Sequence, residues 1–308
     1  MTTLSKKDLI SVSLLSIEEV ELILTETERL KKGPRNINVL AGQTLAMIFE
    51  KSSTRTRVSF EVGMYQLGGL GMYFSSRDLQ IGRGETIHDT AKVLSRYVNG
   101  IMARTFAHQT VLDLAKYASI PVINGLTDYD HPCQALCDIF TVYEHKGKLK
   151  GLTMAYIGDG NNVLHSLVQS CVKVGMNINY ASPEGYRPLE SVITEAKDVA
   201  KTTGSIITPT DNAYDAIKNA DIIYTDVWVS MGQEEENQKR IKDLKEFQLN
   251  GELMKKAKPD VLVMHCLPAH RGEEITDEVV DGPNSIVFDQ AENRLHTQKA
   301  IMKLLMAK

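Results

Sequence analysis

The segment 52–57 gathers hydroxyl and guanidinium groups in six consecutive residues. It reads Ser-Ser-Thr-Arg-Thr-Arg and joins an apolar run to an amphipathic helical pattern. The free backbone N–H groups and the positive dipole end of a helix start favour an anion, and arginine offers a forked donor that fits phosphate. A Ser or Thr helix cap followed by solvated arginines would give a similar pattern. The density of donors favours a phosphate site.

A second polar segment, 128–138, reads Asp-Tyr-Asp-His-Pro-Cys-Gln-Ala-Leu-Cys-Asp. Pro132 suits the first turn of a helix, which would place His131 at the helix mouth and Gln134 in its first turn. A histidine there tends to be neutral and could donate one hydrogen bond to a carbonyl oxygen. The alternative is a capping turn with a surface histidine. Arg104 follows another apolar run, at the strand end where open α/β sheets bind ligands.

The second half opens with a strand, a tight turn and a helix around Gly158-Asp159-Gly160. This pattern half-resembles the dinucleotide fingerprint. Val163 stands where the third glycine belongs, however, and no acidic residue follows the next strand to bind a ribose. The pattern therefore disfavours a nicotinamide cofactor, and Asn162 can contact another polar ligand.

Three further polar clusters, 225–232, 265–272 and 290–294, lie at the ends of apolar runs. Asp226 offers a carboxylate to an amine, and Cys266 offers a thiol. Adjacent residues on a strand point to opposite faces, so His265 should not simply activate Cys266 as a nucleophile. Trp228, the single tryptophan, is interpreted as a packing residue.

Short apolar runs alternate with amphipathic ones along the whole chain, which is typical of an α/β protein with parallel strands. The predicted strands are 44–49, 71–74, 100–103, 121–123, 152–157, 177–181, 205–207, 222–225, 261–265 and 285–288, and the predicted helices of the first half lie near 55–68, 86–97, 108–118 and 132–146.

The polar, glycine-bearing segment 146–151 follows a long helical pattern and marks a domain boundary. We expect one domain at 1–148 and a second at 149–290. The amphipathic helix 291–308 could pack on either domain, and we expect it to pack back on the first.

Composition excludes several classes of protein. The 308 residues are 43% hydrophobic and carry a net charge of −4, which argues against nucleic acid as a partner. No apolar stretch is long enough to cross a membrane, and the first residues show no signal or transit pattern, so we expect a cytoplasmic protein. Four cysteines are too few for a disulfide framework. Cys133 and Cys137 lack a second ligand pair nearby, so we expect no metal.

The motifs S-T-R-T-R, R-T, H-P-C-Q, D-x-W-x-S-M-G, H-C-L-P and a late arginine occur in this order. Their types and order resemble the aspartate/ornithine carbamoyltransferase family over essentially the whole chain. Ser230-Met231-Gly232 and the segment 265–268 resemble its ornithine branch. The resemblance implies two doubly wound α/β domains, each with a mainly parallel sheet flanked by helices, and transfer of a carbamoyl group from carbamoyl phosphate to the δ-amine of L-ornithine.

The resemblance also implies roles for individual residues. Those expected to bind carbamoyl phosphate are Ser53, Thr54, Arg55, Thr56, Gln80, Arg104, His131, Gln134, Cys266, Leu267 and Arg294. Those expected to bind ornithine are Asn162, Asp226, Ser230 and Met231. Arg55, Arg104, His131 and Cys266 are the expected catalytic residues, with Cys266 orienting the amine. No cofactor, a cis Leu267–Pro268 bond and a homotrimer or a multiple of trimers are further implications.

Three other functions stay open at this point. A carbamoyltransferase acting on putrescine would keep the phosphate motifs without needing to recognise an α-amino acid. A dinucleotide-dependent oxidoreductase would use the glycines near 158. A catalytically silent binding protein of the same fold would lack phosphate ligands, and none is missing here.

Overall fold

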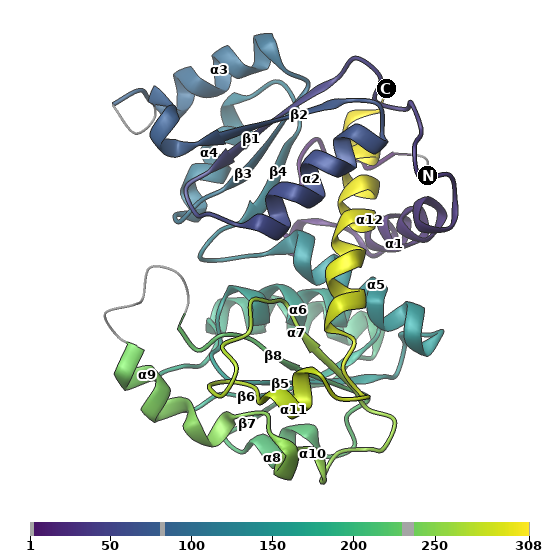
Figure 1. The fold of residues 1–308 in the computed structure, drawn as a ribbon, viewed down its shortest axis with the longest axis vertical. Coiled ribbons are helices and arrows are strands. Elements are labelled where there is room, and N and C mark those ends of the chain that lie inside the picture. Colours follow the sequence, from purple (N-terminus) through teal and green to yellow (C-terminus); the bar gives the residue numbers. More distant parts are fainter. Residues whose placement is uncertain (1–2, 81–83, 230–236, 308) are drawn as a thin grey trace. The chain divides into compact units, whose positions relative to one another are not determined.

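The chain folds into two compact units in a computed structural model that describes residues 3–80, 84–229 and 237–307 (Figure 1). The first unit comprises Met1–Phe140 together with Glu292–Lys308, and the second comprises Thr141–Ala291. The division falls inside helix α5 (Pro132–Lys146), whereas the sequence placed it in the polar segment just after that helix. Each unit holds a parallel sheet flanked by helices, which confirms the predicted fold class.

The first unit is built on a four-stranded parallel sheet in the order β2-β1-β3-β4. Every residue of β3 is buried, as expected for a central parallel strand covered on both faces. Its strands are β1 (Thr44–Phe49), β2 (Leu70–Ser75), β3 (Gly100–Arg104) and β4 (Val122–Leu126).

Helices cover both faces of this sheet. Those of the first unit are α1 (Ile17–Lys32), α2 (Thr54–Gln66), α3 (Ile87–Tyr97), α4 (His108–Tyr117), the start of α5, and α12 (Val287–Met306) from Glu292 on, with short 3-10 turns at Val12–Leu14 and Ser76–Asp78. Helices α3 and α4 pack on Ile48, Ile101 and Val122. On the other side α12 lies against α2 (Figure 1), where a Cβ on Gly63 would come within 2.7 Å of the Met302 Cε atom.

The second unit has a five-stranded parallel sheet in the order β7-β6-β5-β8-β9. Ala155, Ile223 and Val263 belong to the core on one face, which the short helices α8, α10 and α11 also line. Helices α6 and α7 lie beside each other (Figure 1). The strands are β5 (Thr153–Ile157), β6 (Asn177–Ala181), β7 (Ile207–Thr210), β8 (Ile222–Thr225) and β9 (Leu262–His265), and the helices are α6 (Asn162–Lys173), α7 (Glu190–Thr203), α8 (Ala213–Ile217), α9 (Asn237–Leu244), α10 (Gly251–Met254) and α11 (Asp277–Val280), with a 3-10 turn at Lys245–Phe247.

The predicted strand 285–288 is wrong. Ser285 makes only an isolated parallel bridge with Val263, and the Ile286 N–H donates to the Val263 carbonyl at 3.0 Å. Helix α12 then begins at Val287, so the last helix starts earlier than the predicted 291. An apolar tetrapeptide has no periodicity that could separate a strand from the first turn of a buried helix. Among the described residues, no helix is both long and apolar enough to span a membrane.

Two glycines follow β5, and each is required for a different reason: Gly158 for its backbone conformation and Gly160 for the close approach of another loop. Gly158 has φ of +127°, a backbone conformation that other residues rarely adopt. A Cβ on Gly160 would lie 2.3 Å from the Pro188 backbone nitrogen and 2.6 Å from the Arg187 carbonyl carbon. These glycines therefore serve a tight turn whether or not a phosphate binds there.

We predict that Gly160→Ala destabilises the second unit, because the added methyl group can be placed only by shifting backbone. Overpacking of this kind costs about 1–3 kcal/mol, which lowers the Tm by roughly 2–4 °C per kcal/mol in a unit of this size. Thermal unfolding followed by circular dichroism measures the effect. The matched control is Gly185→Ala, where no atom lies within 4 Å of the added Cβ and only the positive φ is strained. Equal loss in both variants would contradict the steric argument.

Candidate functional site

The start of α2 places the predicted phosphate segment. Ser53 is the helix cap, and its hydroxyl oxygen accepts a hydrogen bond from the Thr56 backbone N–H at 3.2 Å. Thr54 is exposed, Arg55 is half-buried and Thr56 is buried. Arg57 is held elsewhere, since its Nε donates to Glu61 at 3.1 Å and its guanidinium stacks on a tyrosine ring. Because the Arg57 guanidinium is bound by Glu61 and the tyrosine ring, Arg55 is the arginine of this segment that stays the candidate phosphate ligand.

Arg294 of α12 joins this segment to the start of α5. Its Nη1 donates to the Gln134 side-chain oxygen at 2.5 Å, and its Nη2 donates to the Thr56 hydroxyl at 3.3 Å. Arg294 is 3% exposed and Gln134 is 1% exposed. The Gln134 side-chain nitrogen in turn donates to Asp138 at 2.8 Å. Four residues from three helices therefore form one buried polar group.

His131 stands directly before α5, as predicted, and is 4% exposed. Burial lowers the pKa of its imidazole well below the ordinary value, and the positive charges of Arg294, Arg104 and Arg55 lower it further. Of these arginines, Arg55 lies at the start of α2, Arg104 is the last residue of β3 and Arg294 belongs to α12. The result is an electropositive region around a histidine that stays uncharged.

Three contacts that the sequence did not predict join the loops of this region. Lys51 is 6% exposed, donates to the Asp128 carboxylate at 2.5 Å and lies 4.4 Å from the centre of the Phe106 ring. The Glu50 carboxylate accepts from the Phe106 backbone N–H at 2.8 Å. Glu50 and Lys51 directly precede the phosphate segment, and Asp128 opens the histidine segment. In the sequence, the charged residues beside both motifs were the available indication of these contacts.

Gln80 takes no part in the contacts above, and two predicted ornithine ligands fall outside the described residues. Gln80 is exposed and directly precedes residues 81–83, which lie outside the described part of the chain. Ser230 and Met231 also lie outside the described residues.

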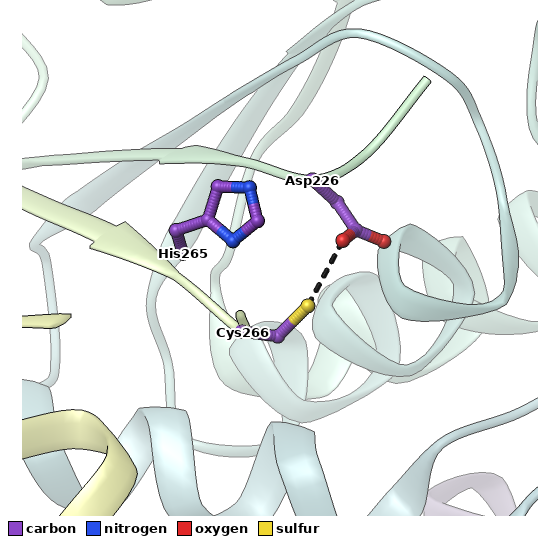
Figure 2. Close-up of side chains that lie close together, drawn as sticks. All are labelled: Asp226, His265 and Cys266. Atoms are coloured by element: carbon purple, nitrogen blue, oxygen red, sulfur yellow. Dashed lines mark hydrogen bonds between the residues drawn. The ribbon is translucent and has the colours of Figure 1, made fainter. Parts of the chain in front are cut away.

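In the second unit, Asp226 directly follows β8 and is 4% exposed. One oxygen accepts from the Asn161 side-chain nitrogen at 2.8 Å, and the other accepts from the Cys266 thiol at 2.9 Å. Figure 2 shows the Asp226 carboxylate and the Cys266 sulfur facing each other. The predicted Asn162 is the first residue of α6, one position after the asparagine that contacts Asp226.

His265 supports the turn that follows β9. Its Nδ1 accepts from the Leu267 backbone N–H at 2.8 Å, so the proton of the ring is on Nε2, which lies 2.9 Å from the Glu274 carboxylate. Both ring nitrogens are thus engaged by groups other than the Cys266 thiol, which agrees with the prediction that His265 does not simply activate it. Leu267 has φ of +57°, and the implied cis Leu267–Pro268 bond is confirmed.

Two groups of side chains could geometrically hold a cation. Their potential ligand atoms lie within 4.8 Å of one another, in Asp226 with His265 and Cys266, and in His270 with Glu273 and Glu274. Spacing along the chain does not indicate these groups, because separate strands and loops bring their atoms together, and the absence of a metal stays a prediction. Cys133 and Cys137 are both buried, and the Cys133 thiol donates to the Asn124 carbonyl at 3.4 Å. Burial raises the pKa of Cys133 to about 12, so this thiol does not readily form the thiolate that binds metals.

Comparison with known proteins agrees with this geometry. Residues 7–144 match the family described as "Aspartate/ornithine carbamoyltransferase, carbamoyl-P binding domain", and residues 150–305 match "Aspartate/ornithine carbamoyltransferase, Asp/Orn binding domain". The chain belongs to the aspartate/ornithine carbamoyltransferase family.

Individual relatives are similar over almost their full length. The ornithine carbamoyltransferase of Thermococcus kodakarensis is 57% identical over 309 residues, which cover 99% of this chain and 98% of the relative. That of Bacillus subtilis is 56% identical over 307 residues, covering 100% and 96%. A solved structure of ornithine carbamoyltransferase from Pyrococcus furiosus has a TM-score of 0.95 at 53% identity, covering 99% of this chain and 98% of that one.

We predict that the His131 imidazole of the unliganded protein stays neutral as the pH falls through the ordinary histidine value of about 6.5. A lowered pKa keeps the ring uncharged until the pH is well below that value. NMR of labelled histidines between pH 5.5 and 8 measures this, with His131→Gln used to assign the signal. A titration midpoint near 6.5 for that signal would contradict the electrostatic picture of the site.

Proposed function

We propose that this protein transfers the carbamoyl group of carbamoyl phosphate to the δ-amine of L-ornithine, giving L-citrulline and phosphate. The observation that carries the proposal is the buried His131 before α5, whose pKa is lowered by burial and by the charges of Arg294, Arg104 and Arg55. Such a region suits a dianionic phosphate and a polarised carbonyl together. The names of the relatives, all with ornithine as substrate, agree with this reaction.

Carbamoyl phosphate is the substrate proposed for the first unit. The start of α2 supplies backbone donors, hydroxyls and the Arg55 guanidinium for the phosphate. Gln134 is oriented by Arg294 and Asp138, which suits it to hold the carbamoyl amino group. The proposed ligands in this unit are Ser53, Thr54, Arg55, Thr56, Gln80, Arg104, His131, Gln134 and Arg294.

Arg104 and His131 are proposed to polarise the carbamoyl carbonyl. As the amine attacks the carbonyl carbon, negative charge develops on the carbonyl oxygen before phosphate leaves. A neutral imidazole can donate a hydrogen bond to that oxygen without protonating it, and the guanidinium supplies positive charge. No cofactor is needed, because carbamoyl phosphate is already activated.

Ornithine is the substrate proposed for the second unit, with Asn162, Asp226, Ser230 and Met231 as ligands. Asp226 is buried with neutral donors on both oxygens, so its negative charge is available to the α-ammonium group of the substrate. Cys266 and Leu267 are proposed to line the junction between the substrates. The Cys266 thiol donates to Asp226, which suits an orienting group rather than a covalent nucleophile.

The attacking δ-amine must be neutral. Cationic ligands of carbamoyl phosphate disfavour a second positive charge nearby and so lower the pKa of the amine. A homotrimer or a multiple of trimers, a cytoplasmic location, and activity without metal stay predictions. The assignment of carbamoyl phosphate binding to residues 1–148 with the last helix, and of ornithine binding to 149–290, is likewise part of the proposal.

We predict that purified protein produces phosphate and citrulline from carbamoyl phosphate and L-ornithine. The amine panel also contains putrescine and 5-aminopentanoate, which lacks the α-amino group of ornithine. Colorimetric assays of the ureido product, which is citrulline for ornithine, and of phosphate give kcat/KM for each amine. A higher kcat/KM for putrescine than for ornithine would contradict the proposed substrate, and a spectral change with a nicotinamide cofactor would favour the oxidoreductase alternative.

We predict that Arg55→Ala weakens carbamoyl phosphate binding by roughly 10- to 100-fold, since a hydrogen bond to a charged group contributes about 1.5–3 kcal/mol. Isothermal titration calorimetry measures the affinity. The matched control is Arg57→Ala, two residues away in the same helix, whose guanidinium is held by Glu61 and the Tyr73 ring. Equal affinity losses in both variants would contradict a specific role for Arg55.

A further inference from the structure

The side chain of Asn161 has a fixed orientation. Its Oδ1 accepts from the Val163 backbone N–H at 2.9 Å and from the Leu164 backbone N–H at 3.3 Å, so it caps the start of α6. An amide group has one oxygen and one nitrogen on opposite sides. With the oxygen held by two backbone donors, the nitrogen must point the other way, where it meets the Asp226 carboxylate at 2.8 Å.

The cap is itself embedded in the turn after β5. The Tyr156 hydroxyl donates to the Asp159 carbonyl at 2.8 Å and lies 3.4 Å from the Asn161 oxygen. Burial, together with the negative charge of Asp226, raises the pKa of Tyr156 well above its ordinary value, so this hydroxyl stays a donor. Strands β5 and β8 are neighbours in the sheet, which brings the end of one beside the end of the other.

The two groups that hold the Asp226 carboxylate are an amide and a thiol. They satisfy one lone pair on each oxygen, but neither brings a formal positive charge. Among the described residues, the carboxylate is thus held in a fixed direction by neutral donors, and a cation can complete its surroundings. In the proposed function that cation is the α-ammonium group of ornithine.

We propose that Asn161 is a positioning residue for substrate selection: it fixes the direction of the Asp226 carboxylate from the start of α6, without touching the substrate itself. The inference rests on the proposed function and adds a determinant of specificity to it. Capping a helix and orienting a carboxylate are separate tasks of the two ends of one amide, so substitutions can separate them.

Asn161→Ser tests the orienting task. Serine is a good helix cap, so α6 is kept while the donor to Asp226 is lost. We expect the KM for ornithine to rise about tenfold, as for the loss of roughly one net hydrogen bond, with kcat changed less than threefold. Carbamoyl phosphate affinity should stay unchanged. The preference for ornithine over 5-aminopentanoate should fall, because the Asp226 carboxylate no longer has a fixed direction.

The matched control is Asn212→Ser. Asn212 caps α8 in the same unit, and its oxygen accepts from Tyr214 and Asp215 backbone N–H groups at 2.8 and 3.3 Å. It shares the capping geometry and is exposed. Both substitutions change a helix cap, so both can lower the Tm slightly. Only Asn161→Ser should change the KM for ornithine and the amine preference, and the control should keep the wild-type values.

Asn161→Asp provides a second variant of nearly identical shape. It keeps the cap and is favoured by the helix dipole, but it places a carboxylate oxygen against the Asp226 carboxylate. Repulsion should turn Asp226 away and raise the KM for ornithine more than Asn161→Ser does. Wild-type KM and wild-type amine preference in both variants, with only the Tm lowered, would reduce Asn161 to a helix cap and overturn the proposal.

Failure of the proposed function has a different signature. Wild-type protein that makes no citrulline refutes the reaction itself. The Asn161 assignment is then decided by alkylation of Cys266 with iodoacetamide, because this is the one cysteine of four that is not buried and its thiol contacts the same carboxylate. Added negative charge in Asn161→Asp should slow alkylation, since it disfavours the thiolate. An unchanged rate would overturn the contact.

Discussion

The guanidinium of Arg294 is buried inside the first unit, so its donors need acceptors there. It finds them on Gln134 at the start of α5 and on Thr56 at the start of α2. These contacts fix two helix starts relative to each other and add a third positive charge beside Arg55 and Arg104. Burial is the main cause that lowers the pKa of His131, and the three positive charges of this arrangement lower it further, because a fourth cation in the same buried space would be repelled.

The second unit shows the opposite electrostatic arrangement. Its polar side chains converge on the carboxylate of Asp226, which receives neutral donors from the ends of two neighbouring strands. In both units these polar groups lie mainly at the carboxyl ends of parallel strands and at the starts of the helices that follow them, where open α/β sheets bind ligands. One fold type thus presents an anion-attracting surface in one unit and a cation-attracting carboxylate in the other.

Much of this arrangement is predictable from sequence. Buried parallel strands are short apolar runs, and β1, β6 and β8 match their predicted ranges, as does helix α5 after Pro132. The contacts of Lys51 with Asp128 and of Asn161 with Asp226 were not predicted, because they join residues far apart in the chain. Of two adjacent asparagines, only the folded turn identifies the one that faces the carboxylate. The two groups of His, Cys and carboxylate side chains that could hold a cation were also not predicted, because they too are brought together only by folding.

The first unit is discontinuous in the chain, and this has a consequence for protein synthesis. Arg294 belongs to the segment that starts at Glu292, whereas its partners precede the second unit. On the ribosome, the whole of 141–291 is therefore synthesised before Arg294, the third arginine near His131, is added to the chain. All residues of the second unit are then present, while the first unit still lacks the part of α12 from Glu292 on. A nascent chain stalled before residue 292 would hold Thr56 and Gln134 without the guanidinium that joins them.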